Sequence, residues 1–412
     1  MRLDIDGRNC ELESGRSILD AVKKEGLDSI MLSDRPLAAQ IGGEVFNLRF
    51  TPKKDTQIHL LRYGEDMGRR VYERTLQFLF ILAMRKEFPR ARVCVRYSLG
   101  PGLFITVDGM EEPFNEEAAL KVETEMRRLV RLKLPLERRR ISIKEALSFY
   151  EQDGQADKAK LLKWRRFSYF DVYQIDGYMD YFYGEMAPDT SYADVFRVKY
   201  VHDGAVVLLM PRSDAPDVPS DYVDLPKLHA VFHQSDEWGK LMECATVNDL
   251  NTHIQNGTIR ELVRINEALH DRGYADIADK IVQKGAKAVL VAGPSSSGKT
   301  TSAHRISTQL RLQGCHPVML SLDDYYIDRD KIERDENGEI DLENINTLDI
   351  QRFGSDLAAL IRGEKVEVPR FDFTNGKRAP EGRILQLHDD EPVIIEGIHG
   401  LNPMLLSPEV DE

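Results

Sequence analysis

The residues in this sequence whose types and spacing are best suited to chemistry are 293-GPSSSGKTT-301. The stretch has the spacing G-x-x-x-x-G-K-[ST], in which the glycines let successive backbone N–H groups point at phosphate oxygens. In such a loop the lysine reaches the β- and γ-phosphates of a nucleotide, and the hydroxyl that follows it ligates Mg²⁺. The sequence therefore predicts a site for Mg²⁺ and a nucleoside triphosphate at Gly293, Pro294, Ser295, Ser296, Ser297, Gly298, Lys299, Thr300 and Thr301.

The elements that must position this loop are also predicted. Residues 288–292 are a short apolar run typical of a buried strand, and 300–314 has the apolar spacing of a helix that stops at Gly314. A phosphate-binding loop needs this order, because the positive end of the helix then faces the phosphate. The context argues against an accidental match.

Two further apolar strands end in carboxylates, in 317-PVMLSLDDYY-326 and 392-PVIIEG-397. Substrates of open α/β sheets bind at the carboxyl ends of the strands, where Asp323 would lie and could accept a proton from an attacking hydroxyl. Glu396 has the position of an acidic residue that holds Mg²⁺ through water. The sequence contains no N-K-x-D segment of the kind by which GTPases read guanine, so these residues favour a kinase.

Four segments in the same order, 293–301, 321-SLDDYY-326, 368-VPRFDF-373 and 393-VIIEG-397, resemble the phosphoribulokinase/uridine kinase family. The resemblance implies that 286–412 is a parallel α/β P-loop domain that transfers the γ-phosphate of ATP to a hydroxyl group, with Mg²⁺ as the metal.

The resemblance also implies roles for single residues. Asp323 would be the general base, and Tyr326 and Phe371 would flank the substrate. Glu343 falls where the family has an aspartate that binds ribose hydroxyls, and Gly376 falls where it has a histidine. These two departures leave the acceptor open between a nucleoside and a pentose-like sugar.

The sequence after Glu396 predicts an incomplete kinase domain. Family members carry arginines on a lid that follows this strand and have about five strands, whereas three strands are legible from 286 onward and Arg383 is the last Lys or Arg. Such an arginine is worth about 10³ to 10⁵ in rate. We therefore expect a truncated domain that transfers phosphate slowly.

The N-terminal segment, 1–62, alternates short strand patterns with turns. A hairpin around Asp6-Gly7, a helix over 17–26, a hairpin through Gly42-Gly43 and a strand over 57–62 are predicted. This ββαββ order resembles the TGS domain, a β-grasp module.

The second segment, 63–212, resembles the editing domain of threonyl-tRNA synthetase. Helices are predicted over 71–89 and 115–133, and strands over 92–99, 103–109, 167–186 and 205–212. The family's two metal-binding histidines fall on Phe78 and Leu82, and its later cysteine–histidine pair falls on Ala187 and Ser191. None of these side chains is a metal ligand or proton carrier of that kind, so we expect a retired catalytic domain without zinc, kept as a scaffold or binding surface.

The third segment, 213–285, is predicted to be a helical connector packed on the last domain. It opens with a Pro/Asp-rich loop over 213–226 and contains a helix over 258–273, with a capping box from Thr258 to Glu261 and Gly273 as its stop.

Two other patterns could bind ligands. His229, His233 and Glu237 share a helix face, but they lack the glutamate of a zinc-protease helix, and we interpret them as partly buried histidines. The run 127-RRLVRLKLPLERRR-140 could contact RNA, but it contains no aromatic residue for stacking, and we interpret it as a solvated helix face interrupted at Pro135.

Composition limits the class of protein. The 412 residues are 42% hydrophobic and 30% charged, with a net charge of −13 that argues against a protein that coats nucleic acid. Apolar runs such as 78-FLFILAM-84 are far shorter than the roughly 20 residues of a membrane helix. Widely spaced cysteines and an N-terminus without an apolar core predict a cytoplasmic protein. Its oligomeric state stays open, and so does an alternative function as an ATP-gated RNA- or protein-binding module.

Overall fold

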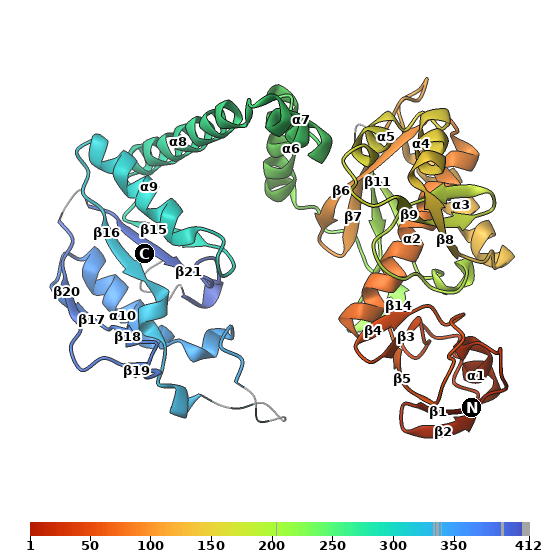
Figure 1. The fold of residues 1–412 in the computed structure, drawn as a ribbon. Helices are drawn as coiled ribbons and strands as arrows, with labels where there is room; N and C mark the ends of the chain where they lie inside the picture. Colours follow the sequence, from red (N-terminus) through yellow and green to blue (C-terminus); the bar gives the residue numbers. More distant parts are fainter. Residues whose placement is uncertain (203, 333, 335–337, 339, 389–390, 406–412) are drawn as a thin grey trace. The chain divides into compact units, whose positions relative to one another are not determined.

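The computed structural model describes residues 1–412 except 203, 333, 335–337, 339, 389–390 and 406–412, and Figure 1 traces the chain. Contacts within the chain divide it into two units, Met1–Thr252 and His253–Glu412. Each unit mixes helices and strands, which confirms the predicted multidomain α+β and α/β class. Among the described residues, no helix combines the length and the apolar composition that crossing a membrane requires.

The first unit begins with a β-grasp module. Its sheet has the order β2-β1-β5-β3-β4, in which β1 and β5 are parallel and the other neighbours antiparallel. Both predicted hairpins are present, and both have the positive φ angles that a tight two-residue turn requires, at Asp6 and Gly7 (50° and 82°) and at Gly42 and Gly43 (57° and 88°). The elements are β1 (Arg2–Ile5), β2 (Arg8–Glu11), α1 (Ile18–Lys24), β3 (Ala38–Ile41), β4 (Glu44–Phe46) and β5 (Thr56–Leu61).

Helix α1 of this module begins at a capping box. The Ser17 side chain accepts from the Asp20 N–H, and the Asp20 carboxylate accepts from the Ser17 N–H. This arrangement satisfies two backbone groups that a helix start would otherwise leave free. The apolar face of α1 is buried in the same core cluster as β1 and β5 residues, so the helix covers the sheet as Figure 1 shows.

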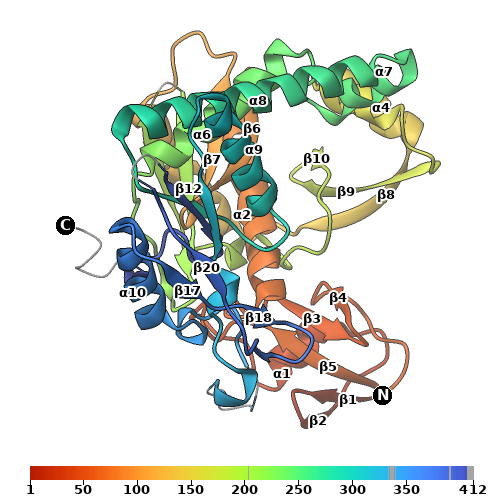
Figure 2. The ribbon, with the colours of Figure 1, turned by 90° about the vertical axis from the view of Figure 1, so that its left-hand side faces the viewer.

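The second module of this unit is built around a long buried helix, α2 (Asp66–Glu87). A four-stranded sheet of order β11-β12-β7-β6 and a three-stranded sheet of order β10-β9-β8 belong to it. Figure 2 shows β8 and β9 running together toward α4. The other elements are β6 (Arg92–Leu99), β7 (Gly102–Asp108), α3 (Glu116–Leu132), β8 (Glu137–Ser142), α4 (Ile143–Gln152), α5 (Ala156–Leu162), β9 (Tyr169–Ile175), β10 (Tyr178–Asp180), a 3-10 helix (Thr190–Tyr192), β11 (Arg197–His202), β12 (Ala205–Leu209), β13 (Pro211–Arg212) and β14 (Ala215–Pro219).

Three predictions for this region were wrong or incomplete. The basic run is not one helix face, because its second half is strand β8, whose Arg138 and Arg140 both pair across the sheet with Asp171 of β9. Helices α4 and α5 were not predicted. The Pro/Asp-rich loop contains a strand, β14, which pairs with β13. Strand β8 was missed because its partner β9 is distant in sequence, and β14 was missed because turn-forming residues surround it.

The histidine pattern lies on α6 (Pro226–Leu241), which is followed by α7 (Val247–Asn256). The Tyr97 hydroxyl and His229 Nδ1 are 2.8 Å apart, and Tyr97 stacks on Phe232 with ring centroids 4.2 Å apart. Burial lowers the pKa of His229, and the neighbouring His202 and His233 lower it further. Among the described residues, no three or more His, Cys, Asp or Glu side chains are grouped as a metal site.

The first helix that lies wholly in the second unit is α8 (Ile259–Lys284), which does not stop at Gly273 as predicted. The helix ends instead at Gly285, whose φ is 58°. An internal glycine costs about 1 kcal/mol, which the packing of Ala278 and Ile281 on helix α9 exceeds. The capping box was also wrong, because Thr258 makes no side-chain cap hydrogen bond.

The core of the second unit is a parallel sheet of order β15-β21-β16, which confirms the three predicted strands. Ile394 of β21 packs with α8 and α9, while Val393 and Ile395 pack with α10, so helices cover both faces of the sheet (Figure 1). The elements are β15 (Ala288–Ala292), α9 (Lys299–Leu312), β16 (Val318–Ser321), α10 (Ile350–Ile361), β17 (Val366–Val368), β18 (Phe371–Asp372), β19 (Lys377–Arg378), β20 (Arg383–Leu385), β21 (Val393–Gly397) and 3-10 helices at Leu322–Tyr325, Arg329–Lys331, Ile345–Thr347 and Pro403–Leu405. The small antiparallel pairs β17–β20 and β18–β19 were not predicted.

Candidate active site

The predicted phosphate-binding sequence forms a tight loop between β15 and α9. Gly298 has a φ of 87°, which glycine adopts without strain, and a Cβ on Gly293 would lie 2.7 Å from Ser297 Oγ. The backbone conformation therefore favours glycine at 298, and a side chain at 293 would force the Ser297 hydroxyl to move. Lys299 Nζ donates to the Pro294 carbonyl oxygen at 2.9 Å, so the lysine folds back over the loop.

Glu396 lies at the centre of a set of oxygen atoms. Its carboxylate is almost buried, with 8% of the residue exposed. One oxygen accepts from Thr300 Oγ1 at 3.2 Å and the other from Ser321 Oγ at 2.7 Å. The arrangement follows from the sheet order, because β21 lies between the strand that leads to Thr300 and the strand that ends in Ser321.

These oxygens suit a hard cation. Mg²⁺ prefers oxygen ligands and is usually held by one or two protein side chains together with waters and substrate phosphates. Thr300 and Glu396 fit that pattern at the start of α9, where the phosphates of a nucleotide would lie.

Asp323 lies in the 3-10 helix directly after β16. Burial raises its pKa above the ordinary value, the negative charge of Glu396 raises it further, and the ammonium of Lys299 opposes both effects. These influences place Asp323 within electrostatic reach of the predicted phosphate and metal residues. A carboxylate with a raised pKa is a stronger base than an ordinary one, which suits proton abstraction from a hydroxyl.

An aromatic cluster lies beside Asp323. The ring of Tyr326 is 5.7 Å from Phe371 and 6.2 Å from Phe373, measured between centroids, and the two phenylalanines are 5.1 Å apart. Burial raises the pKa of Tyr326, and the charges of Asp323 and Glu343 raise it further. The structure thus brings the four residues predicted for the acceptor side into one neighbourhood. Phe373 was not predicted as part of it, although it alternates with Phe371 in 371-FDF-373.

The space beside Gly376 is filled. Its φ is 65°, and a Cβ there would lie 2.6 Å from Cδ of Arg329. A histidine at this position would displace the arginine side chain. The chain therefore presents a different surface at the position where the resembled family has its histidine.

Two residues near Glu396 were not given a role from the sequence. Ser321 was recognised only as part of a motif, and His399 only as part of the last residues of the chain. The only sequence signal for His399 is the pair of glycines that flank it in 397-GIHG-400.

The positions that correspond to editing residues are packed differently. Phe78, Leu82 and Ala187 are 0%, 2% and 0% exposed. The Phe78 ring packs on Tyr178 and Phe182, with centroids 5.9 and 5.3 Å apart. These positions are part of an apolar core.

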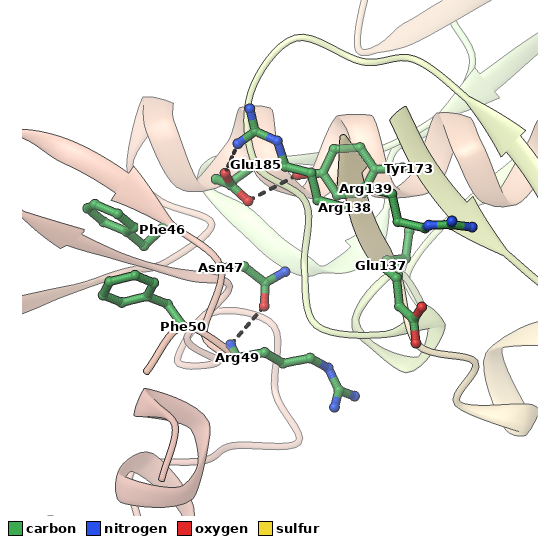
Figure 3. A pocket seen from close by; sticks show the side chains of 10 residues that line it. Phe46, Asn47, Arg49, Phe50, Glu137, Arg138, Arg139, Tyr173 and Glu185 are labelled. Carbon is green, nitrogen blue, oxygen red and sulfur yellow. Dashed lines mark hydrogen bonds and ion pairs between the residues drawn. The ribbon is translucent and has the colours of Figure 1, made fainter. Parts of the chain in front are cut away.

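The first unit also contains a pocket of about 510 Å³ between its two modules. Figure 3 shows Phe46 and Phe50 on one side and Arg138, Tyr173 and Glu185 on the other. The two phenylalanine rings are 4.5 Å apart, and Arg138 pairs with Glu185. The lining residues are Phe46, Asn47, Arg49, Phe50, Leu136, Glu137, Arg138, Arg139, Tyr173 and Glu185.

Comparisons with known proteins relate the C-terminal region of the chain to one family and its N-terminal and middle region to another. Residues 288–405 match the model of the Phosphoribulokinase / Uridine kinase family. A solved structure described as a possible uridine kinase from Bacillus stearothermophilus is 24% identical and covers 34% of this chain and 77% of its own, with a TM-score of 0.28.

The N-terminal and middle region is similar to threonine–tRNA ligases. The ligase of Clostridium kluyveri is 25% identical over 47% of this chain, and that of Acetivibrio thermocellus is 28% identical over 38%. The matches cover 30% and 24% of these relatives, so the chain spans less than a third of their length. The similarity agrees with the predicted TGS and editing-like modules.

Proposed function

We propose that this chain, whose residues 288–405 match the phosphoribulokinase/uridine kinase family, is an ATP-dependent kinase that phosphorylates a hydroxyl of a nucleoside or pentose-like acceptor. The observation that carries the proposal is that the Glu396 carboxylate accepts hydrogen bonds from both Thr300 and Ser321. Thr300 belongs to the predicted phosphate loop, and Ser321 lies two residues before Asp323. The proposed phosphate site and the proposed base, Asp323, therefore lie at the same end of one sheet. A nucleotide switch alone does not need such a base.

In the proposed mechanism, the loop 293–301 binds the ATP phosphates through its N–H groups, and Lys299 turns from the Pro294 carbonyl to the β- and γ-phosphates. Thr300 and Glu396 would hold Mg²⁺, which when bound neutralises charge on those phosphates. Asp323 accepts the proton of the acceptor hydroxyl as its oxygen attacks the γ-phosphorus, and ADP leaves.

The acceptor is proposed to bind against Tyr326, Phe371 and Phe373, whose faces suit the flat side of a base or a sugar ring. The Glu343 carboxylate is available to accept hydrogen bonds from sugar hydroxyls. Arg329 occupies the space beside Gly376, which supports an acceptor with a different outline from that of uridine.

The test is a panel of nucleosides and pentoses incubated with the full chain, Mg²⁺ and ATP labelled at the γ-phosphate. We expect label in one chemical class of acceptor. Lys299→Ala should abolish the label, while Lys280→Ala, on the exposed part of α8, should leave it unchanged. Equal labelling by the wild type and Lys299→Ala would refute the site.

A second candidate function is an ATP-gated module that binds RNA without turnover, and the pocket in Figure 3 favours it. Its paired phenylalanines suit base stacking. The Arg139 guanidinium bonds only to the neutral Gln174 side chain and has no carboxylate partner in the described part of the chain, so it is available for a phosphate.

The two functions are separated by fluorescence anisotropy with short single-stranded RNA, with and without Mg·ATP. The RNA function predicts ATP-dependent binding that Arg139→Glu weakens and that Arg166→Glu, an exposed arginine outside the pocket, weakens less. The kinase function predicts labelled acceptor and no ATP-dependent retention of RNA.

A further inference from the structure

The turn 397-GIHG-400 at the end of β21 packs closely against the residues at the ends of β15 and β16. A Cβ on Gly397 would lie 2.6 Å from Cβ of Leu322, the residue before Asp323. A Cβ on Gly400 would lie 3.2 Å from Cβ of Ala292, the last residue before the phosphate loop. Because Gly397 and Gly400 have no side chains, the turn can contact both Leu322 and Ala292. His399 lies in the turn between these two glycines.

The His399 imidazole has an unmet hydrogen-bonding capacity. Its Nε2 atom is buried and has no hydrogen-bond partner among the described residues. Buried polar atoms nearly always have a partner, so an exception needs an explanation, and a catalytic role is one of the recognised explanations. The imidazole is also within electrostatic reach of Asp323.

The order of the strands indicates which ligand could bind His399 Nε2. The phosphate loop follows β15, Asp323 follows β16, and His399 follows β21, which lies between them. The donor phosphates therefore approach from one side of His399 and the acceptor hydroxyl from the other. The group that occupies the middle position in a transfer reaction is the γ-phosphoryl group.

We propose that His399 Nε2–H donates a hydrogen bond to the γ-phosphoryl group of bound ATP, and that His399 is the residue by which the site distinguishes ATP from ADP. The inference rests on the proposed kinase function. A neutral imidazole carries one N–H, and a hydrogen bond from it to a phosphate oxygen is charge-assisted. Such a bond corresponds to about a 10- to 100-fold effect on affinity.

The experiment is calorimetric titration of the full chain with Mg·ADP and with the Mg complex of the non-hydrolysable β,γ-imido analogue of ATP. His399→Ala should lose about 10- to 100-fold in affinity for the triphosphate and keep its affinity for ADP. His399→Gln, which retains an N–H donor, should recover part of the loss. His304→Ala, exposed on α9, is the matched control and should behave as wild type.

Each other outcome is informative. An equal loss for both nucleotides, or no loss, would overturn the role of His399 while leaving the kinase proposal intact, provided that the wild type binds both nucleotides. A changed KM for the acceptor with an unchanged preference for triphosphate would instead assign Nε2 to the acceptor and overturn the inference. If His399→Ala does not fold, the nucleotide preference of His399→Gln decides. A wild type that binds neither nucleotide would overturn both proposals.

Discussion

The sequence predicts a retired catalytic site in one region of this chain and a working site in another, and the two regions are built in opposite ways. In the editing-like module, Phe78, Leu82 and Ala187 are apolar and fully buried. In the second unit, Glu396 and Asp323 are buried or half-buried carboxylates that repel each other. Buried polar groups cost free energy unless they are hydrogen-bonded or paired, so apolar packing is expected where no chemistry requires a polar group. The retained polar cluster in the second unit is therefore the better candidate for activity.

The largest expected effect comes from Asp323→Asn. Removal of a positioned base should lower the rate of phosphate transfer by about 10² to 10⁴ while ATP still binds. The measurement is single-turnover transfer to the acceptor found in the panel, together with calorimetry of ATP binding. Asp276→Asn, an exposed carboxylate on α8, is the control. Transfer at the full rate in Asp323→Asn would make Asp323 a structural residue.

The same variant should raise stability. The pKa of Asp323 is higher in the folded than in the unfolded chain, so its favourable contribution exists at low pH and is lost as pH rises through the folded pKa. At pH 7 the carboxylate destabilises the kinase unit, and Asp323→Asn should raise the melting temperature of the metal-free chain by about 1 to 3 °C. A lower melting temperature for Asp323→Asn than for wild type at pH 7 would show that the carboxylate stabilises the fold. It would weaken the contrast between the second unit and the editing-like module.

A polar group in the editing-like module should be costly. Phe78→His places a ring with two nitrogens among Tyr178 and Phe182 and should reduce the free energy of unfolding of the first unit by about 2 to 4 kcal/mol. Phe167→His, where the ring is exposed, should change it little. Urea unfolding of the three chains measures the difference. A Phe78→His chain as stable as wild type would show that this region still accommodates a ligand-bearing side chain.

The affinity for ATP should depend on Lys299. Its ammonium is the one lysine charge in the phosphate loop, so Lys299→Ala should weaken ATP binding by about 10- to 100-fold. RNA binding to the first unit, if present without ATP, should not change. Calorimetry with Mg·ATP checks the first statement, and unchanged affinity would remove the loop from the nucleotide site.

The smallest expected effect is a pH dependence of the first unit. His59 lies between Asp6 and Glu65, at 2.9 and 2.7 Å, and its hydrogen bonds to both carboxylates raise its pKa. Its stabilising contribution is complete below pH 6.5 and is lost as pH rises through the folded pKa. Because the pair is half-exposed, the effect should stay below about 1 kcal/mol. His59→Gln should flatten the pH dependence of unfolding above pH 6.5, whereas the exposed His316→Gln should not.

Much of the geometry of the candidate site was predictable because its signals are local. The phosphate loop joins an adjacent strand and helix, and Asp323 and Glu396 each end a strand that reads as buried from its own residues. Parallel strands bring such ends to one edge, so their proximity follows from the sheet. The β-grasp hairpins were predictable for the same reason, since Asp6-Gly7 and Gly42-Gly43 are strong turn signals.

What could not be predicted depends on contacts between residues distant in sequence. Gly273 reads as a helix stop, and only the packing of Ala278 and Ile281 on α9 carries α8 past it. The sequence of strand β8 looks like part of a basic helix. Only its pairing with β9, where Asp171 forms ion pairs with the arginines of β8, shows that it is a strand. The sequence does not single out His399, because its candidate role depends on the burial of Nε2 and on the residues that its turn contacts.

The most direct test of the central claim is a balance of products in one reaction containing the full chain, Mg·ATP, the acceptor panel and single-stranded RNA. The account predicts that ADP and phosphorylated acceptor form in equal amounts, and that ADP formation stops when the acceptor is omitted. ATP-dependent retention of RNA without any phosphorylated acceptor would contradict it.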